Sequence, residues 1–120
     1  MELKILTQQL KQHLNKLKER YNHFEPPKNR RDKDFFELVK RETTPVYSLL
    51  EEWEEMALEK VKEREINVHP QQVTRTRENM ELVLMHSYYI DARRKRYMEL
   101  SQSVLYIFDQ IISELSVLNK

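Results

Sequence analysis

Apolar side chains in the first part of the chain recur at steps of three and four residues. Residues at these steps share one face of an α-helix, whereas a strand alternates at every second residue. The pattern predicts one amphipathic helix from Glu2 to His23. Glu25-Pro26-Pro27 should end it, because proline lacks an N–H and disfavours helical geometry in the residue before it. The apolar positions are Leu3, Leu6, Leu10, Leu14, Leu17, Tyr21 and Phe24.

A second apolar stripe follows a polar connection. We expect Asp32 or Asp34 to cap this helix by accepting hydrogen bonds from its first amides. The stripe keeps its phase across Pro45, which favours a kink there without a change of direction. The alternative is that Thr44 caps a separate helix beginning at Pro45. The helix is expected to end near Glu65. Its apolar positions are Phe35, Phe36, Val39, Val46, Leu49, Leu50, Trp53, Met56, Ala57 and Val61.

The segment from Gln71 to Lys120 contains no proline and carries two more stripes. A strict heptad count runs unbroken from Val73 to Leu118, so the pattern alone admits one long helix. At 1.5 Å per residue that rod would measure roughly 70 Å, more than the first two helices can cover. We favour a corner near Ile90 and Asp91, with Asp91 capping the last helix. The two stripes are Val73, Met80, Val83 and Leu84, then Tyr97, Ser101, Val104, Phe108, Ile111, Leu115 and Leu118.

Composition narrows both the fold and the chemistry. The 120 residues include no glycine, which excludes P-loop and Rossmann fingerprints, and no cysteine, which excludes disulfides and thiolate chemistry. The net charge of +1 gives no long-range attraction to nucleic acid or anionic lipid. No segment reaches the roughly 18 apolar residues of a membrane span, and the first residues lack the apolar core of a signal peptide. We therefore predict a cytoplasmic, all-α protein, with residues 1–120 forming one antiparallel up-and-down four-helix bundle.

The stretch HSYYIDARRKRY, residues 86–97, is the strongest candidate for a binding surface. Successive helical residues turn by 100°, so the cations of Arg93–Arg96 spread around the helix instead of forming one patch. Arg94 and Lys95 should point mainly to solvent. We expect the acidic run EEWEE at 51–55 to offset these charges.

Two tyrosines in the same stretch have two interpretations. Tyr88 and Tyr89 could close the end of the bundle with their hydroxyls in water, or they could anchor a partner, since Tyr and Arg are enriched at interfaces. The candidate partner-binding residues are Tyr88, Tyr89, Arg93, Arg94 and Arg96.

The glutamates and histidines give only weak support for a metal or acid–base site. Helical metal sites use Glu-x-x-His pairs, and no glutamate here has a histidine three residues later; HExxH is also absent. His69, before Pro70, is expected in a loop, and His13 at the edge of the core. We assign no catalytic, metal-binding or cofactor-binding residue and expect no cofactor.

Three segments taken together resemble the YppE-like family of small uncharacterised bacterial proteins. They are the helix entry NVHPQQVTRTREN, the corner YYIDARRKRY and the closing helix SQSVLYIFDQIISEL. The resemblance covers nearly the whole chain and implies an up-and-down four-helix bundle in the cytoplasm. It implies no activity, so it assigns no functional residue.

Three functional hypotheses follow. The first is a non-enzymatic module that binds another protein or a second copy of itself through a helix face. The alternative is a small metal-dependent or acid–base enzyme that uses glutamates and histidines of the bundle. A distant third is nucleic-acid binding through Arg93–Arg96, which would weaken steeply with salt.

Overall fold

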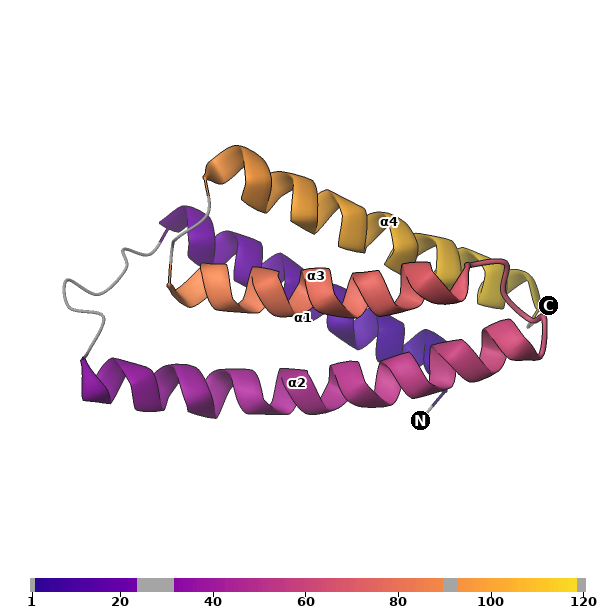
Figure 1. The fold of residues 1–120 in the computed structure, drawn as a ribbon, viewed down its shortest axis with the longest axis horizontal. Coiled ribbons are helices and arrows are strands. Elements are labelled where there is room, and N and C mark those ends of the chain that lie inside the picture. Colours follow the sequence, from indigo (N-terminus) through magenta and orange to yellow (C-terminus); the bar gives the residue numbers. More distant parts are fainter. Residues whose placement is uncertain (1, 24–31, 90–92, 119–120) are drawn as a thin grey trace.

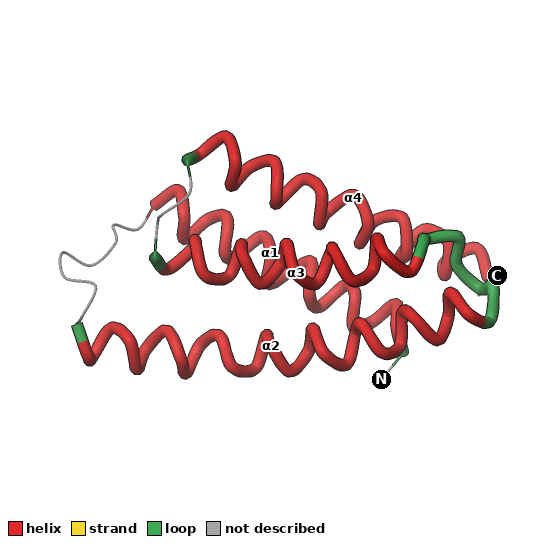
Figure 2. Tube along the Cα trace, in the orientation of Figure 1, coloured by secondary structure: helices red, strands yellow, loops and turns green. Residues whose placement is uncertain are grey.

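Four α-helices make up the structure, a computed structural model that describes residues 2–23, 32–89 and 93–118 (Figure 1). They are α1 (Leu3–His23), α2 (Lys33–Lys62), α3 (Pro70–Tyr88) and α4 (Arg94–Leu118). Successive helices run in opposite directions, and the described residues contain no strand (Figure 2). The predicted all-α four-helix fold is confirmed. α1 and α3 pack against every other helix, whereas α2 and α4 lie diagonally across the bundle and meet through core side chains such as Trp53 and Phe108.

The corner between α3 and α4 shows whether the second half of the chain forms two helices or one long helix. α3 ends at Tyr88, α4 begins at Arg94, and the two helices pack side by side. The buried hydroxyls of Ser87 and Tyr97 meet at 2.6 Å, which joins the two helices beside the corner. The alternative of one long helix is therefore wrong. The predicted cap at Asp91 lies outside the described residues, as do Phe24 and the Glu25-Pro26-Pro27 stop.

The start of α2 follows the predicted capping. The Asp32 side chain accepts a hydrogen bond from the Phe35 amide at 3.1 Å, so Asp32 is the N-cap. The helix continues through Pro45, and Thr44 lies inside it, with its hydroxyl donating to the Lys40 carbonyl at 2.6 Å. The alternative of a separate helix capped by Thr44 is wrong. The kink at Pro45 stays a prediction.

The connection between α2 and α3 differs from the expectation at both ends. α2 ends at Lys62 instead of near Glu65, and Arg64 adopts a left-handed backbone with φ of 62°. Glycine usually occupies such a position after a helix, and this chain has none. His69 is the N-cap of α3: its Nδ1 accepts from the Gln71 amide at 3.1 Å. Sequence reasoning missed this cap because histidine is not a usual capping residue.

The core is centred on Trp53, which is fully buried and packs edge-on against Phe108 at 5.4 Å. Its indole N–H donates to the hydroxyl of Thr7, a buried polar residue between the predicted leucines. All four stripes contribute to this core, but Phe36 does not: its side chain is 54% exposed. The fully buried large side chains are Trp53, Tyr97, Phe108, Leu6, Leu10, Leu14, Leu50, Met80, Leu84, Ile111, Val68 and Val73.

Candidate partner-binding groove

α1 and α2 draw apart toward the end of the bundle where α1 finishes and α2 begins, and α3 lies between them (Figures 1 and 2). This divergence opens a groove of about 810 Å³, which we call the basic groove. Its floor is formed by four buried side chains, namely Leu17, Val46, Leu84 and Tyr88. Its rim carries His13, Lys16, Glu19, Arg20, His23, Arg41, Glu42 and Pro45.

A cluster of three side chains ties the floor to both walls. The Tyr88 hydroxyl, from α3, donates to a Glu42 carboxylate oxygen on α2 at 2.6 Å. The Arg20 guanidinium, from α1, lies 4.2 Å from the centre of the Tyr88 ring, a cation–π distance. Burial, followed by the bond to Glu42 and its charge, raises the pKa of Tyr88, so the hydroxyl remains a donor at neutral pH. The cluster holds the three helices together beneath the groove.

Basic side chains outnumber acidic ones on the rim. Three are basic, Lys16, Arg20 and Arg41, and two are glutamates. One of those glutamates, Glu42, already accepts the Tyr88 hydroxyl. Burial and the nearby Lys16 ammonium lower the pKa of His13, which favours its neutral form. The groove therefore combines an apolar floor with a rim suited to carboxylates.

Two searches of the described residues concern metal ions and membrane spans. No three His, Asp or Glu side chains among them lie close enough together to hold a metal ion. Within the same ranges, no helix is long and apolar enough to cross a membrane.

The structure separates the two tyrosines predicted to act together. Tyr88 lies in the floor of the basic groove, whereas Tyr89 packs edge-on against Phe35 at 5.3 Å. The expectation that both hydroxyls lie in water is wrong. The Tyr88 hydroxyl is bonded to Glu42, and the Tyr89 hydroxyl oxygen is buried, without a hydrogen-bond partner among the described residues. Adjacent residues on a helix end diverge by about 100°, which explains the separation.

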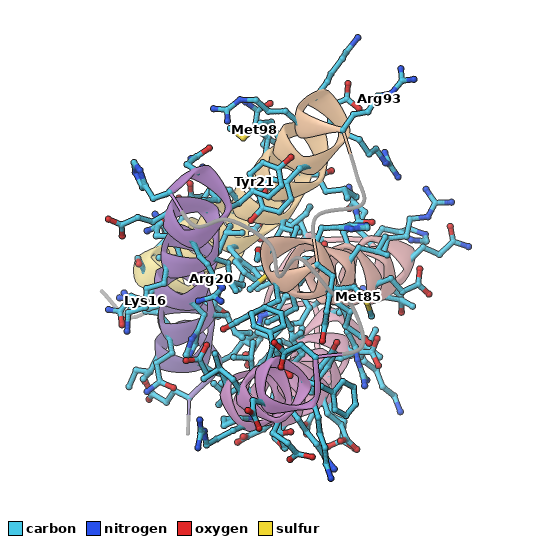
Figure 3. All side chains as sticks on the ribbon, turned by 90° about the vertical axis from the view of Figure 1, so that its left-hand side faces the viewer. Lys16, Arg20, Tyr21, Met85, Arg93 and Met98 are labelled. Atoms are coloured by element: carbon cyan, nitrogen blue, oxygen red, sulfur yellow. The ribbon has the colours of Figure 1, made fainter. Side chains whose placement is uncertain are left out.

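The predicted arginines lie at the start of α4, away from the basic groove. Arg93, Arg94 and Arg96 are exposed. Figure 3 shows Arg93 at the beginning of α4, on the far side of Tyr21 from Arg20. Arg94 does not point only to solvent, because it donates to the Asn22 side chain of α1 at 2.7 Å.

The acidic run at 51–55 does not offset these arginines. Trp53, at the centre of this run on α2, packs against Phe108, about three turns beyond Arg96 along α4. Glu54 instead accepts from Arg77 of α3 at 3.0 Å, and Arg77 also binds Glu81 at 3.1 Å. The expected pairing is wrong because the run is level with the middle of α4, at Phe108, and not with the arginines at its start.

Sequence reasoning missed the residues that form the rim of the groove. A signal for them exists in the first helix, where His13, Lys16, Arg20 and His23 follow steps of three and four beside the leucine stripe. Such a series places basic side chains along one edge of a helix. The rim residues on α2, above all Glu42 and Arg41, show no comparable sequence pattern. They reach the rim only because α1 and α2 diverge.

Comparison with known proteins finds similarity throughout the bundle. Residues 7–115 match a bacterial domain of unknown function, DUF1798. Over 84 residues the chain is 31% identical to the uncharacterised protein YppE of Bacillus subtilis (strain 168), covering 69% of this chain and 68% of that protein. The crystal structure of yppE from Bacillus subtilis superposes with a TM-score of 0.85 at 27% identity, covering 98% of this chain and 94% of that chain.

Proposed function

The chain belongs to the bacterial DUF1798 family, as the resemblance to the YppE-like family implied, and on that premise we propose that it is a non-enzymatic module that binds a partner protein through the basic groove. We place this module in the cytoplasm, as a single domain. A chain without cysteine suits a reducing compartment.

The observation that supports the proposal is the pairing of an apolar floor with a basic rim in one concave surface. Interfaces are typically anchored by apolar and aromatic contacts at the centre and surrounded by polar groups. Leu17, Val46 and Tyr88 supply the centre, and Lys16 and Arg41 supply charges on opposite walls.

The chemistry of the groove defines the partner segment. Its position between two helices, with an apolar floor, fits an amphipathic helix that packs its apolar side chains on that floor, as in other helix-in-groove complexes. Asp or Glu side chains flanking that apolar stripe would meet Lys16 and Arg41. A guanidinium such as that of Arg41 can bind a carboxylate through two parallel hydrogen bonds.

Affinity capture followed by a binding measurement tests the proposal. The wild-type chain, immobilised, is used to capture proteins from the native host, and each captured protein is then purified. Its affinity is measured by calorimetry for the wild type and for Lys16→Glu with Arg41→Glu. We expect the double variant to weaken binding at least about tenfold, a loss of about 1.4 kcal/mol.

Arg93→Glu with Arg96→Glu is the matched control, because it makes the same change in net charge on exposed residues at the start of α4. It should leave binding to the captured protein unchanged. Equal binding by the wild type and the groove variant would refute the proposal. Binding lost only in the control variant would transfer the partner site to the start of α4, as the sequence pattern first indicated.

A further inference from the structure

His13 is a half-buried residue of α1 that lines the basic groove. Side chains three and four positions apart on a helix are neighbours, so Gln9, Leu10, Lys16 and Leu17 surround it on α1. None of these four is acidic, and Lys16 is a cation. Along its own helix, His13 therefore has a neighbouring cation and no neighbouring carboxylate.

The part of α2 opposite His13 is uncharged. α1 and α2 run in opposite directions (Figure 1), and the hydrogen bond from Trp53 to Thr7 sets their register. His13 comes six residues after Thr7, so it lies level with the residue six before Trp53. The stretch 43–50 (TTPVYSLL) surrounds that level and has no acidic or basic side chain. At this height, α2 offers no counter-charge to His13.

The other titratable groups around His13 have partners of their own or lie elsewhere. At its height they are, on α2, Tyr47, which lies beside Glu81 outside the groove, and Glu52, which is exposed and outside the groove lining; on α3, Glu81, which binds Arg77; and on α4, Asp109, which binds Lys11. Further toward the end of α1 the rim carries Glu19, Arg20 and His23, with Arg41 and Glu42 on α2, and Glu42 accepts from Tyr88 of α3.

The protonated form of His13 therefore lacks a counter-charge within the chain. Among the described residues, burial and the Lys16 ammonium lower the pKa of His13, and no carboxylate raises it. The imidazole is neutral in the free chain at about pH 7.5. A carboxylate brought to the rim from outside would favour the protonated form, because an opposite charge nearby stabilises an imidazolium.

We propose that an acidic segment bound in the basic groove takes up a proton at His13, so that a fall in pH strengthens binding. This inference rests on the proposed function and adds to it a residue that makes the affinity depend on pH. Coupling between two ligands is reciprocal, so a segment that raises the affinity of His13 for a proton binds more tightly when that proton is present. The sign follows: affinity rises as pH falls from about 7.5 to 6.0, while the carboxylates of the segment stay ionised.

Calorimetry with a defined probe tests the proposal. The probe is a synthetic amphipathic peptide of about 14 residues, with leucines at steps of three and four and glutamates beside them. We expect the wild type to bind it about threefold more tightly at pH 6.0 than at pH 7.5, the effect of one partly exposed ion pair. Titrations at pH 6.0 in two buffers of different ionisation enthalpy should show proton uptake on binding.

His13→Gln should lose both the pH dependence and the proton uptake, because glutamine keeps a polar side chain that does not titrate. His23→Gln is the matched control: it removes the other rim histidine, which is exposed at the opposite end of the groove, and should keep most of the pH dependence. Thermal unfolding at both pH values checks that the two variants fold.

The outcomes separate this inference from the proposed function. If Lys16→Glu with Arg41→Glu weakens peptide binding but the affinity of the wild type does not change with pH, only the inference falls. It also falls if His13→Gln keeps the proton uptake, or if His23→Gln alone removes it. A peptide that binds neither chain, or binds the wild type and the Lys16→Glu, Arg41→Glu variant equally, would overturn the proposed function as well.

Discussion

Thr7→Val is the most informative single change in the core, since it removes one oxygen atom and nearly preserves shape. The Thr7 hydroxyl accepts the Trp53 indole N–H at 3.0 Å and donates to the Leu3 carbonyl at 2.7 Å. Both Thr7 and Trp53 are fully buried, at 0% exposure. Valine fills the same space but offers no acceptor, so the indole N–H would stay buried without a partner.

The loss of stability expected for Thr7→Val follows from the cost of burying the Trp53 indole N–H without an acceptor. Leaving a buried donor unpaired costs about 1–3 kcal/mol of unfolding free energy. For a chain of 120 residues the entropy of unfolding is about 0.25 kcal/mol per kelvin, so Tm should fall by about 4–12 °C. Thr7→Ser keeps the hydroxyl and separates its effect from that of the methyl group.

A double-mutant cycle, followed by circular dichroism in urea, tests this reasoning. Trp53→Phe removes the donor, and in that background Thr7→Val should cost less than about 0.5 kcal/mol. The difference between the cost of Thr7→Val in the two backgrounds is then the free energy lost by leaving the indole N–H without an acceptor. If Thr7→Val costs the same in both backgrounds, or costs nothing in the wild type, the bond does not stabilise the fold in this way.

Three further predictions concern pH and local helix structure. Burial raises the pKa of Tyr97 to about 12, above the ordinary value of 10, so the folded state keeps this proton between those values and the free energy of unfolding should fall as pH rises from about 10 to 12. Urea titrations across this range should show a smaller fall for Tyr97→Phe; an unchanged slope would contradict the shift. Asp32→Ala should lower the free energy of unfolding by about 1 kcal/mol, whereas Asp32→Asn, which can still cap Phe35, should change it little. Pro45→Ala should raise it by about 1–3 kcal/mol by returning an N–H donor to the Arg41 carbonyl, and lower stability in urea would refute that account.

The helices were predictable because burial imposes a period on the sequence. Spacing alone placed the leucines of α1 in the core, and the N-cap at Asp32 was predicted from its chemistry. On α4 the spacing identified five buried apolar residues, Tyr97, Val104, Phe108, Ile111 and Leu115, but not Leu100 or Ile107, which are also buried. Phe36 was misplaced because periodicity identifies an apolar residue near a face but not whether a neighbouring helix covers it. The end of α2 was misplaced because Arg64 adopts a backbone conformation that its side chain does not signal.

The candidate site was harder to predict, since it depends on contacts between distant segments. Tyr88 was predicted as a candidate binding residue, but its neighbours Glu42 and Arg20 come from two other helices. The run of basic residues Arg93–Arg96 predicted a binding surface at the start of α4, whereas the basic groove lies between α1 and α2. A run of charge in sequence does not specify a concavity, because concavity arises from the angles between helices.

Site-specific photo-crosslinking in the native host tests the central claim, that partners bind in the basic groove. A photoreactive benzoylphenylalanine replaces Arg41, on the rim, or Tyr106, on the exposed side of α4. We predict a cross-linked protein from position 41, absent from position 106 and lost when Lys16→Glu and Arg20→Glu are added. Cross-links from position 106 with none from position 41 would contradict the account.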